Sequence, residues 1–358
     1  MIGYFLRKLG YALLTLFGVV SVIFLLFTIL PGDPAKMMLG QNQTAAQVAQ
    51  VKKKYGFDQP VSTQYFQYLN DLSPISYHSN DPDKYTFLNP DKYSYTTLFE
   101  TSGGAMVIKW PYLRESFQKN GKPVTSVIAE TLPNTVMLAI SAITIAILLG
   151  ILLGVASVIK VNGWLDRTIQ FVSTLGMSVP SFFSAIIFAW IFGFLLHQYT
   201  NLNMTGSLYE VDDFGSGRYI QWKNLILPAV VLGIRPLAVV SQLMRNALLE
   251  VMSQDYIRTA RAKGLSKAQV IWRHALKNAL NPVVTAVSGW FASMLAGAVF
   301  VEYIFGWNGL GKEIVDALNT LDLPIIMGAV LVIASLFIII NIFVDLIYGW
   351  LDPKIRTS

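Results

Sequence analysis

The sequence predicts an all-α integral membrane protein with six transmembrane helices and an extended extracytoplasmic segment after the first helix. Of the 358 residues, 54% are hydrophobic and only 13% are charged, against about 25% charged residues in an ordinary soluble domain. Several apolar runs also reach the roughly 20 helical residues that cross a hydrocarbon core. Lys and Arg, finally, are concentrated in alternate loops between these runs. These observations together indicate one polytopic unit rather than two soluble domains.

Six apolar runs are long enough to be transmembrane helices. The first follows Arg7 and Lys8 and is too long for the apolar core of a signal peptide, so we expect it to remain as an anchor. The chain then divides into an N-terminal end with the first helix (1–30), an extracytoplasmic segment (31–123) and a five-helix core (124–358). The predicted spans are 9–30, 131–159, 168–197, 224–249, 281–302 and 324–350.

The positions of Lys and Arg predict that both termini lie in the cytoplasm. With this orientation the inner segments carry thirteen Lys and Arg residues, whereas the short outer loops carry three, Arg218, Lys223 and Lys312. The segment 31–123 carries ten more, but it exceeds the roughly 60 residues over which the rule applies. Because short cytoplasmic loops are the ones enriched in Lys and Arg, the opposite orientation is disfavoured.

The segment 31–123 has the composition of a small folded subdomain rather than of a linker. Thirteen aromatic residues lie between Tyr55 and Tyr112, whereas disordered segments are poor in aromatic residues. Turn signals such as Asp81-Pro82 and Gly103-Gly104 divide it into short pieces. Two interpretations stay open: a lid that packs on the outer helix ends of its own chain, and a docking surface for a partner protein.

A basic stretch at 256–279, YIRTARAKGLSKAQVIWRHALKNA, is predicted to form two short helices on the cytoplasmic side. A helix-period pattern precedes Gly264, which suits the left-handed conformation that commonly closes a helix. Ser266 and Gln269 then form a capping box that begins a second helix, and Asn281-Pro282 ends it. A loop that only sets topology or touches anionic lipid would not need this turn. The pattern therefore favours insertion into a groove of a partner protein.

At these residues the sequence resembles the permease subunits of binding-protein-dependent ABC importers, in the subgroup that carries peptides, dipeptides and, less often, nickel. The B-type subunit of oligopeptide and dipeptide permeases is the most similar type. The resemblance covers nearly the whole chain apart from about 73–110. The stretches that carry it are TARAKGLS through HALKNALNP in the basic loop, TILPGDP at 28–34, YGFDQPVSTQY at 55–65, TLPNT at 131–135, VEYIFGWNGLG at 301–311 and DPKIR at 352–356.

This resemblance implies the type I ABC importer permease fold in a bacterial inner membrane, with a coupling loop at 250–280. It also implies a second homologous permease, which would form a heterodimer with this chain, two ATPase subunits and an extracytoplasmic substrate-binding protein. ATP and magnesium would be bound by the ATPase subunits, and this chain would hold no cofactor or metal. The residues that the resemblance assigns to coupling with the ATPase are Tyr256, Thr259, Ala260, Arg261, Ala262, Lys263 and Gly264.

Three features are not explained by the resemblance alone. The family usually has a short connection where this chain places the Tyr-rich piece 73–110. Arg235 lies in the middle of a span, where a lipid-facing Arg would cost roughly 2.5–3.5 kcal/mol, so we expect it to line the translocation pathway or face a partner. Asp345 lies inside the last span and is a second pathway candidate, with a structural hydrogen bond or ion pair as the alternative.

Residues 306–312, GWNGLGK, have the glycine and lysine spacing of a phosphate-binding loop. The next residue is Glu313, where such a loop needs Ser or Thr to reach magnesium, and no hydrophobic strand precedes it. We therefore expect no nucleotide site here. The resemblance implies instead that this loop dips back toward the outer mouth of the pathway. Gly150 and Gly154, at four-residue spacing, mark a helix face for close packing, either within the chain or against a second permease.

The sequence favours a transporter subunit over two other classes of protein. A membrane enzyme is disfavoured because the spans carry no HExxH motif, no paired aspartates and no suitable Ser and His. A stand-alone channel would leave the helix pair unexplained. Nucleic acid is not expected as a partner, since the net charge of +6 comes from membrane-flanking loops. The cargo is expected to be peptide, with nickel as the alternative, because the spans lack a His or Met ladder.

Overall fold

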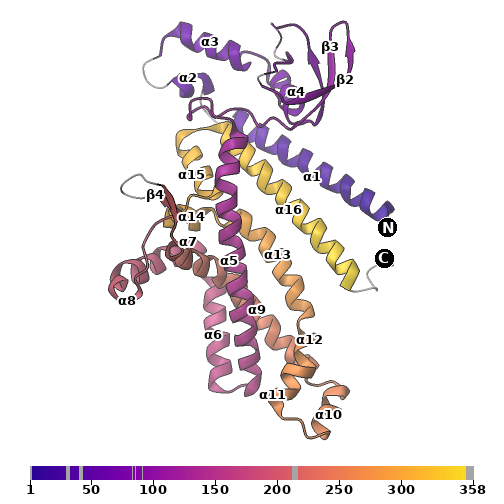
Figure 1. The fold of residues 1–358 in the computed structure, drawn as a ribbon, viewed down its shortest axis with the longest axis vertical. Helices are drawn as coiled ribbons and strands as arrows, with labels where there is room; N and C mark the ends of the chain where they lie inside the picture. Colours follow the sequence, from indigo (N-terminus) through magenta and orange to yellow (C-terminus); the bar gives the residue numbers. More distant parts are fainter. Residues whose placement is uncertain are drawn as a thin grey trace. The chain divides into compact units, whose positions relative to one another are not determined.

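The computed structural model describes residues 2–29, 33–39, 43–82, 84, 86–90, 92–211 and 217–351 (Figure 1). The chain forms two compact units. The first consists of residues 1–130 and 316–335, and the second of residues 131–315 and 336–358. Each unit is described by itself below.

The first unit begins with a long apolar helix and three shorter ones. Phe24 of the long helix lies 5.2 Å from the ring of Tyr65 and 5.8 Å from that of Tyr68, ring centre to ring centre, and it is buried with Val20 in a common cluster. The aromatic residues of the segment thus pack on the first helix. These helices are α1 (Ile2–Ile29), α2 (Pro34–Leu39), α3 (Ala45–Tyr55) and α4 (Val61–Leu72).

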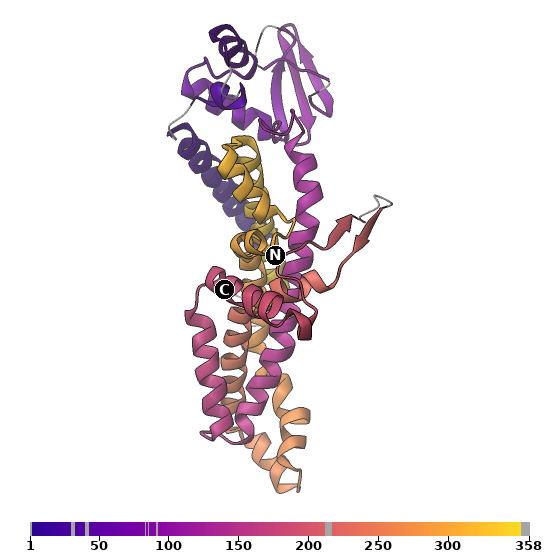
Figure 2. The same ribbon diagram turned by 90° about the vertical axis from the view of Figure 1, so that its left-hand side faces the viewer.

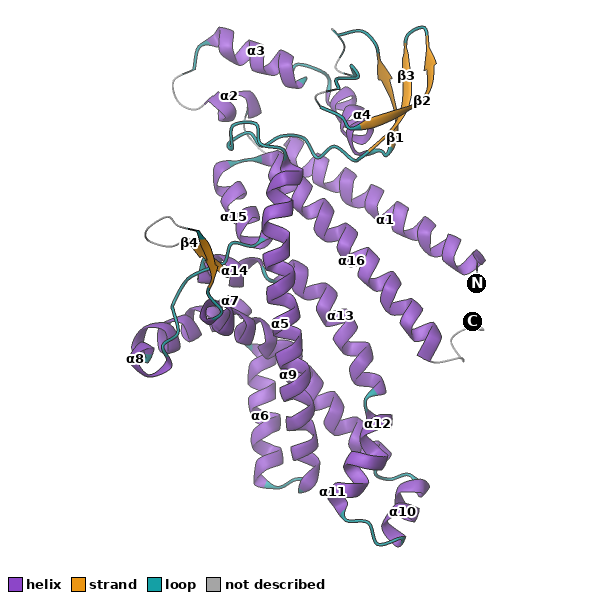
Figure 3. Cartoon of the chain, viewed as in Figure 1, coloured by secondary structure: helices purple, strands orange, loops and turns teal. Residues whose placement is uncertain are grey.

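The same unit contains a three-stranded antiparallel sheet, so the prediction of an all-α chain was wrong for this segment (Figure 3). The strands are ordered β1-β3-β2, with Ile75 opposite Ile108 and Tyr95 opposite Lys109. Aromatic and β-branched residues fit a pleated, half-buried surface, and the run YSYTTLF supplies them. The strands are β1 (Ile75–Ser79), β2 (Tyr95–Thr101) and β3 (Gly104–Lys109).

The second unit is built around two long helices, and one of them, α5, begins in the first unit. Helix α9 packs against α6, and both views of the fold show α5, α6 and α9 running side by side (Figures 1 and 2). Its elements up to α9 are α5 (Val124–Ile159), α6 (Trp164–Ser178), α7 (Ser181–Phe188), the π-helical segment η1 (Ala189–Leu195), α8 (His197–Thr200), β4 (Tyr209–Val211), β5 (Arg218–Ile220) and α9 (Lys223–Val251).

Gly150 and Gly154 of α5 pack against α9 of the same chain. A Cβ added at Gly150 would lie 2.7 Å from Val240 Cγ1, and one at Gly154 would lie 2.6 Å from Met244 Cβ. Real Cβ atoms do not approach so closely, so these glycines allow the two backbones to approach each other. Of the two alternatives for this helix face, the structure shows packing within the chain.

The remaining elements run from the basic loop to the C-terminus. A left-handed residue, Gly306 at φ +66°, ends α14, and α16 passes from the first unit into the second. The elements are α10 (Asp255–Ala262), α11 (Lys267–Val270), the π-helical segment η2 (Ile271–Ala275), α12 (Leu276–Ala279), α13 (Asn281–Gly297), α14 (Val299–Phe305), α15 (Leu310–Thr320) and α16 (Leu323–Leu351).

Four of the described helices are long and apolar enough to cross a membrane, and the count rises to six if each of two bent pairs is one span. The pair 164–178 and 181–195 is bent by 108°, so the predicted single span 168–197 is not one straight helix. Pro180 explains the break, since it disfavours the helical conformation at Val179, whose ψ is 130°. The second pair, 267–279 and 281–296, is bent by 52°, and Pro282 lies in the first turn of α13.

Candidate functional site

The turn between α10 and α11 has the geometry that the sequence predicts. Gly264 has φ +82°, in the left-handed region that favours glycine. Ser266 accepts a hydrogen bond from the backbone N–H of Gln269, whose side chain accepts one from the Ser266 N–H at 2.9 Å. This confirms the capping box. The two short helices are therefore joined at an angle fixed by one glycine and one reciprocal cap.

Helix α10 is held by two apolar residues on one face. Ile257 is fully buried and Ala260 is 6% exposed, and both belong to a cluster with Val270 of α11 and Ile271 of η2. Asn278 of α12 also donates a hydrogen bond to the Tyr256 hydroxyl at 2.7 Å. The helix pair is thus held against α5 and α9 of the same chain, because the cluster also contains Val155 and Val240.

The residues assigned to coupling do not all face outward. Ala260 is buried against its own chain, where its small side chain lets α10 approach α11 closely, so it has no surface left for a partner. The other six are exposed: Tyr256, Thr259, Arg261, Ala262, Lys263 and Gly264. Together with the exposed Arg258, they form a basic surface around the turn.

A buried ion pair joins α6 to α9. Asp166 is 2% exposed and accepts hydrogen bonds from Arg245 Nε at 2.7 Å and Nη2 at 2.8 Å. The same carboxylate accepts the backbone N–H of Asn162 at 2.8 Å, which fixes the loop between α5 and α6. Lys267 of α11 donates to the carbonyl of Ile159 at 2.5 Å. These bonds connect the end of α5 both to α9 and to the helix pair.

The loop at 306–312 is held by the TLPNT stretch of α5, so two of the stretches that carry the family resemblance meet in space. The indole of Trp307 is fully buried and donates to the carbonyl of Asn134 at 3.1 Å. Asn134 Nδ2 in turn donates to the carbonyl of Asn308 at 2.7 Å, and the N–H of Leu310 donates to Thr135 Oγ1 at 2.8 Å.

A buried carboxylate occupies the N-terminus of α15. Glu302 has no exposed surface, and its Oε2 accepts the N–H of Gly311 at 2.7 Å and that of Lys312 at 3.1 Å. A carboxyl oxygen at this position accepts hydrogen bonds from N–H groups that have no partner within the helix. The backbone donors that would face a phosphate in a nucleotide-binding loop are therefore filled by the chain's own side chain.

We expect Glu302→Ala to lower the free energy of unfolding of the chain by about 1–3 kcal/mol, since a buried backbone N–H left without its acceptor costs roughly this much. SDS titration of the purified protein in detergent measures this loss. Asn319→Ala, on the exposed surface of α15, is the matched control and should change little. An unchanged unfolding curve for Glu302→Ala would contradict a structural role of the carboxylate.

Arg235 lies halfway along α9 and is exposed. Its Nη2 donates to the carbonyl of Met177 at 3.2 Å, one residue before α6 ends, where helix carbonyls lack intrahelical partners. Pro236 follows and leaves the carbonyl of Leu232 without its usual helical donor. The side chain of Asp345, the second pathway candidate, lies outside the described part of the chain, as do residues 352–358.

Several contacting residues were not singled out from the sequence. Arg245 was counted only as a loop charge, and neither Asp166 nor Glu302 was assigned a role. Local signals do exist: Asp166 stands three residues after Gly163, at the first turn of a helix that favours acidic residues, and Glu302 interrupts an apolar run. What the sequence does not show is the distant partner of each carboxylate.

Comparison with known proteins places the chain in a family. Residues 127–357 match the model of the binding-protein-dependent transport system inner membrane component, and residues 1–79 match that of the N-terminal part of such components. A dipeptide transport system permease protein of Alkalihalophilus pseudofirmus is 33% identical, over 99% of this chain and all of that protein.

Two further relatives agree with this match. A di/tripeptide transport system permease protein of Pseudomonas aeruginosa is 32% identical over 99% of both chains, and so is a glutathione transport system permease protein of Salmonella choleraesuis. The apolar helices described above, in a chain that matches these proteins from end to end, make this a multi-pass membrane protein of the binding-protein-dependent transport system inner membrane component family.

Proposed function

We propose that this chain is the transmembrane pathway subunit of an ATP-driven importer of short peptides. The observation that carries the proposal is the end-to-end similarity to permeases named for dipeptides, di/tripeptides and glutathione. All three cargoes are short peptides with a free carboxylate. ATP and magnesium would be bound by separate ATPase subunits, and this chain would supply the passage and the contact that couples hydrolysis to it.

The coupling contact in this proposal is the exposed surface around Gly264. A helix that inserts into a groove must be rigid and must project from its support, and α10 is fixed by Ile257 and by the capped turn. Its exposed basic residues suit an acidic groove rim. With this surface in the cytoplasm, both termini lie inside and the subdomain 31–123 lies outside, where a substrate-binding protein would dock. A second, homologous permease would complete the pathway and form a heterodimer with this chain.

Arg235 is proposed to face the pathway, because an exposed mid-membrane guanidinium is tolerable only in water or against protein. One of its donors binds the carbonyl of Met177, and the rest of the group would meet the carboxylate of a passing peptide. We expect Arg235→Leu to reduce uptake of Ala-Phe at least tenfold. Uptake of the C-terminal amide of the same peptide should change much less.

The two peptides separate a pathway role from a purely structural one. If Arg235 only caps α6, then Arg235→Leu lowers uptake of the acid and the amide by the same factor. Uptake of both at the wild-type rate would contradict any role in the pathway. Arg235→Lys, which keeps the charge but not the planar fork of donors, serves as the conservative control.

Nickel is the second candidate cargo, carried over from the sequence-level resemblance. Uptake of labelled Ala-Phe and of labelled nickel, each measured in cells that carry or lack this chain, separates the two. Peptide uptake that depends on the chain, together with nickel uptake that does not, is the expected result. The reverse pattern would overturn the proposal of peptide cargo.

A further inference from the structure

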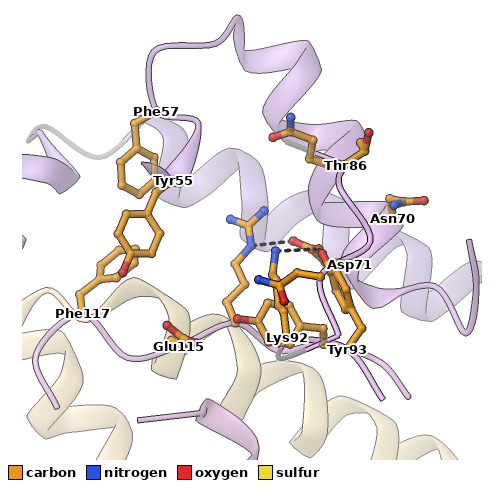
Figure 4. Close-up of a pocket in the computed structure, with 13 residues that line it drawn as sticks. Tyr55, Phe57, Asn70, Asp71, Thr86, Lys92, Tyr93, Glu115 and Phe117 are labelled. Atoms are coloured by element: carbon orange, nitrogen blue, oxygen red, sulfur yellow. Dashed lines mark hydrogen bonds and ion pairs between the residues drawn. The ribbon is translucent and has the colours of Figure 1, made fainter. Parts of the chain in front are cut away.

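A cavity of about 390 Å³ lies in the subdomain 31–123, between α4, the end of α3 and the loops around Lys92 and Arg114 (Figure 4). Its volume falls within the roughly 300–1,000 Å³ of small-molecule sites. Eight of its thirteen lining residues lie within residues 80–126, between the two stretches that the family models match. The cavity is therefore built largely by the part of the chain that those models do not match.

Asp71, at the end of α4, organises the floor of this cavity. Its carboxylate accepts the Tyr93 hydroxyl at 2.7 Å and Arg114 Nε at 3.1 Å, and Lys92 Nζ lies 3.8 Å from it. The backbone carbonyl of the same residue accepts Lys109 Nζ at 2.5 Å. Lys92, Lys109 and Arg114 thus lie around Asp71. Two of these cations, Lys92 and Arg114, line the cavity together with the carboxylates of Asp71 and Glu115.

Two of these cations have capacity for another anion. Arg114 uses only Nε on Asp71, so its two terminal nitrogens have no hydrogen-bond partner among the described residues. Lys92 Nζ sits 4.8 Å from the ring centres of Tyr93 and Tyr112, at a distance from Asp71 that is long for a hydrogen bond. Burial lowers the pKa of Lys92 and lowers the pKa of Lys109 to about 8. The charged form of each lysine is therefore disfavoured by desolvation, and a bound anion would offset this cost.

The backbone at Arg114 supports a role beyond packing. Its φ is +67°, a left-handed conformation that a non-glycine residue adopts at a cost of order 1 kcal/mol. Such conformations persist where the surrounding structure holds them and cluster at ligand sites. At Arg114 the left-handed backbone conformation occurs together with the hydrogen bond from the guanidinium to the Asp71 carboxylate.

The opposite wall is aromatic, and Figure 4 shows Tyr55, Phe57 and Phe117 grouped across the cavity from Asp71, Lys92 and Tyr93. The ring centres of Tyr55 and Phe57 are 5.9 Å apart, and Phe117 meets Phe57 edge-on at 5.8 Å. This wall offers apolar surface for a side chain. The cavity thus presents two cationic side chains, Lys92 and Arg114, beside Asp71 at one side and aromatic surface at the other.

We propose that this cavity binds the C-terminal end of a short peptide, with its carboxylate against Arg114 and Lys92 and its last side chain against Tyr55, Phe57 and Phe117. The inference rests on the proposed function, because it takes the transported peptide as the ligand. It adds a binding site on the extracytoplasmic subdomain of the permease itself. An acidic side chain of a docking protein would offer the same carboxylate, and the experiment separates the two sources.

The test is calorimetric titration of the complete transporter in lipid nanodiscs, without ATP or binding protein, with Ala-Phe and with its C-terminal amide. We expect Ala-Phe to bind, and the amide to bind at least about tenfold more weakly. Lys92→Met should weaken binding of Ala-Phe about tenfold while leaving the bonds of Asp71 to Tyr93 and Arg114 in place. Lys84→Met, which removes an exposed lysine outside the cavity, should bind as the wild type does.

Each of the following results would overturn the proposal: equal affinity for acid and amide, unchanged affinity in Lys92→Met, or loss of binding in Arg235→Leu but not in Lys92→Met. The last result would place the ligand in the pathway and leave the proposed function standing.

If Ala-Phe does not bind, but Lys92→Met abolishes stimulation of ATP hydrolysis by the binding protein, the carboxylate belongs to that protein. Binding with the expected pattern but no peptide uptake by cells would instead contradict the proposed function.

Discussion

Gly264→Val is expected to abolish peptide uptake and to remove the ATPase subunits from the purified complex. Valine in the left-handed conformation costs on the order of 1–2 kcal/mol, so the turn at φ +82° opens and the angle between α10 and α11 changes. The cost is local, because an added Cβ at this position meets no heavy atom of the described chain within 4 Å. The permease should therefore still insert and fold.

The matched control is Gly264→Asn, which adds a side chain at the same place but tolerates the left-handed region. It should keep most of the uptake and of the co-purified ATPase. Both variants are compared at equal expression in the membrane. Normal transport by Gly264→Val would mean that the helix pair serves only as a topology signal.

The second large effect is expected for the ion pair between α6 and α9. Arg245→Ala leaves Asp166, which is 2% exposed, as a buried charge without its partner, and such a change costs roughly 3–5 kcal/mol. The loss should appear as a lower free energy of unfolding in SDS. Uptake should fall as well, because the Asp166 carboxylate also accepts the backbone N–H of Asn162 in the loop before α6 and connects α6 to α9.

Two further variants test whether loss of the ion pair between Asp166 and Arg245 causes this destabilisation. Arg258→Ala removes an exposed pair with Asp255, where surface ion pairs contribute only about 0–1 kcal/mol, so it should leave the free energy of unfolding nearly unchanged. The double variant Asp166→Leu with Arg245→Met removes both charges and should be much more stable than Arg245→Ala alone. If the double variant and Arg245→Ala lose the same free energy of unfolding, the loss comes from the packing of the replaced side chains and not from an unpaired charge.

The parts of the structure that follow local rules could be predicted from the sequence. The glycine turn and the capping box depend on residues within five positions of one another, so the pattern of 264–269 is sufficient for both. Four of the predicted spans also correspond to single long helices. Pro180, by contrast, is visible in the sequence, but because the residues on both sides of it are apolar, the segment 168–197 is predicted as one continuous span.

The contacts that depend on the fold were beyond one sequence. Asp166 and Arg245 are 79 positions apart, and Asn134 and Asn308 are 174 apart. No local pattern pairs them. The sheet of the subdomain 31–123 is not predicted for another reason: its strands alternate with turns inside an aromatic segment whose composition indicates folding but not the type of structure. Asp71 meets Tyr93, Lys109 and Arg114 only in the folded chain, so the residues next to it in the sequence do not indicate these contacts.

The central claim is that this chain forms a path for peptides that opens only with ATP hydrolysis by its partners. The most direct measurement is uptake of radiolabelled Ala-Phe into proteoliposomes that contain this chain, the second permease and the ATPase subunits, with the binding protein added outside and ATP inside. We expect accumulation that requires ATP and that is lost when Gly264→Val replaces the wild-type chain. Accumulation at the same rate without ATP, or with the variant, would contradict it.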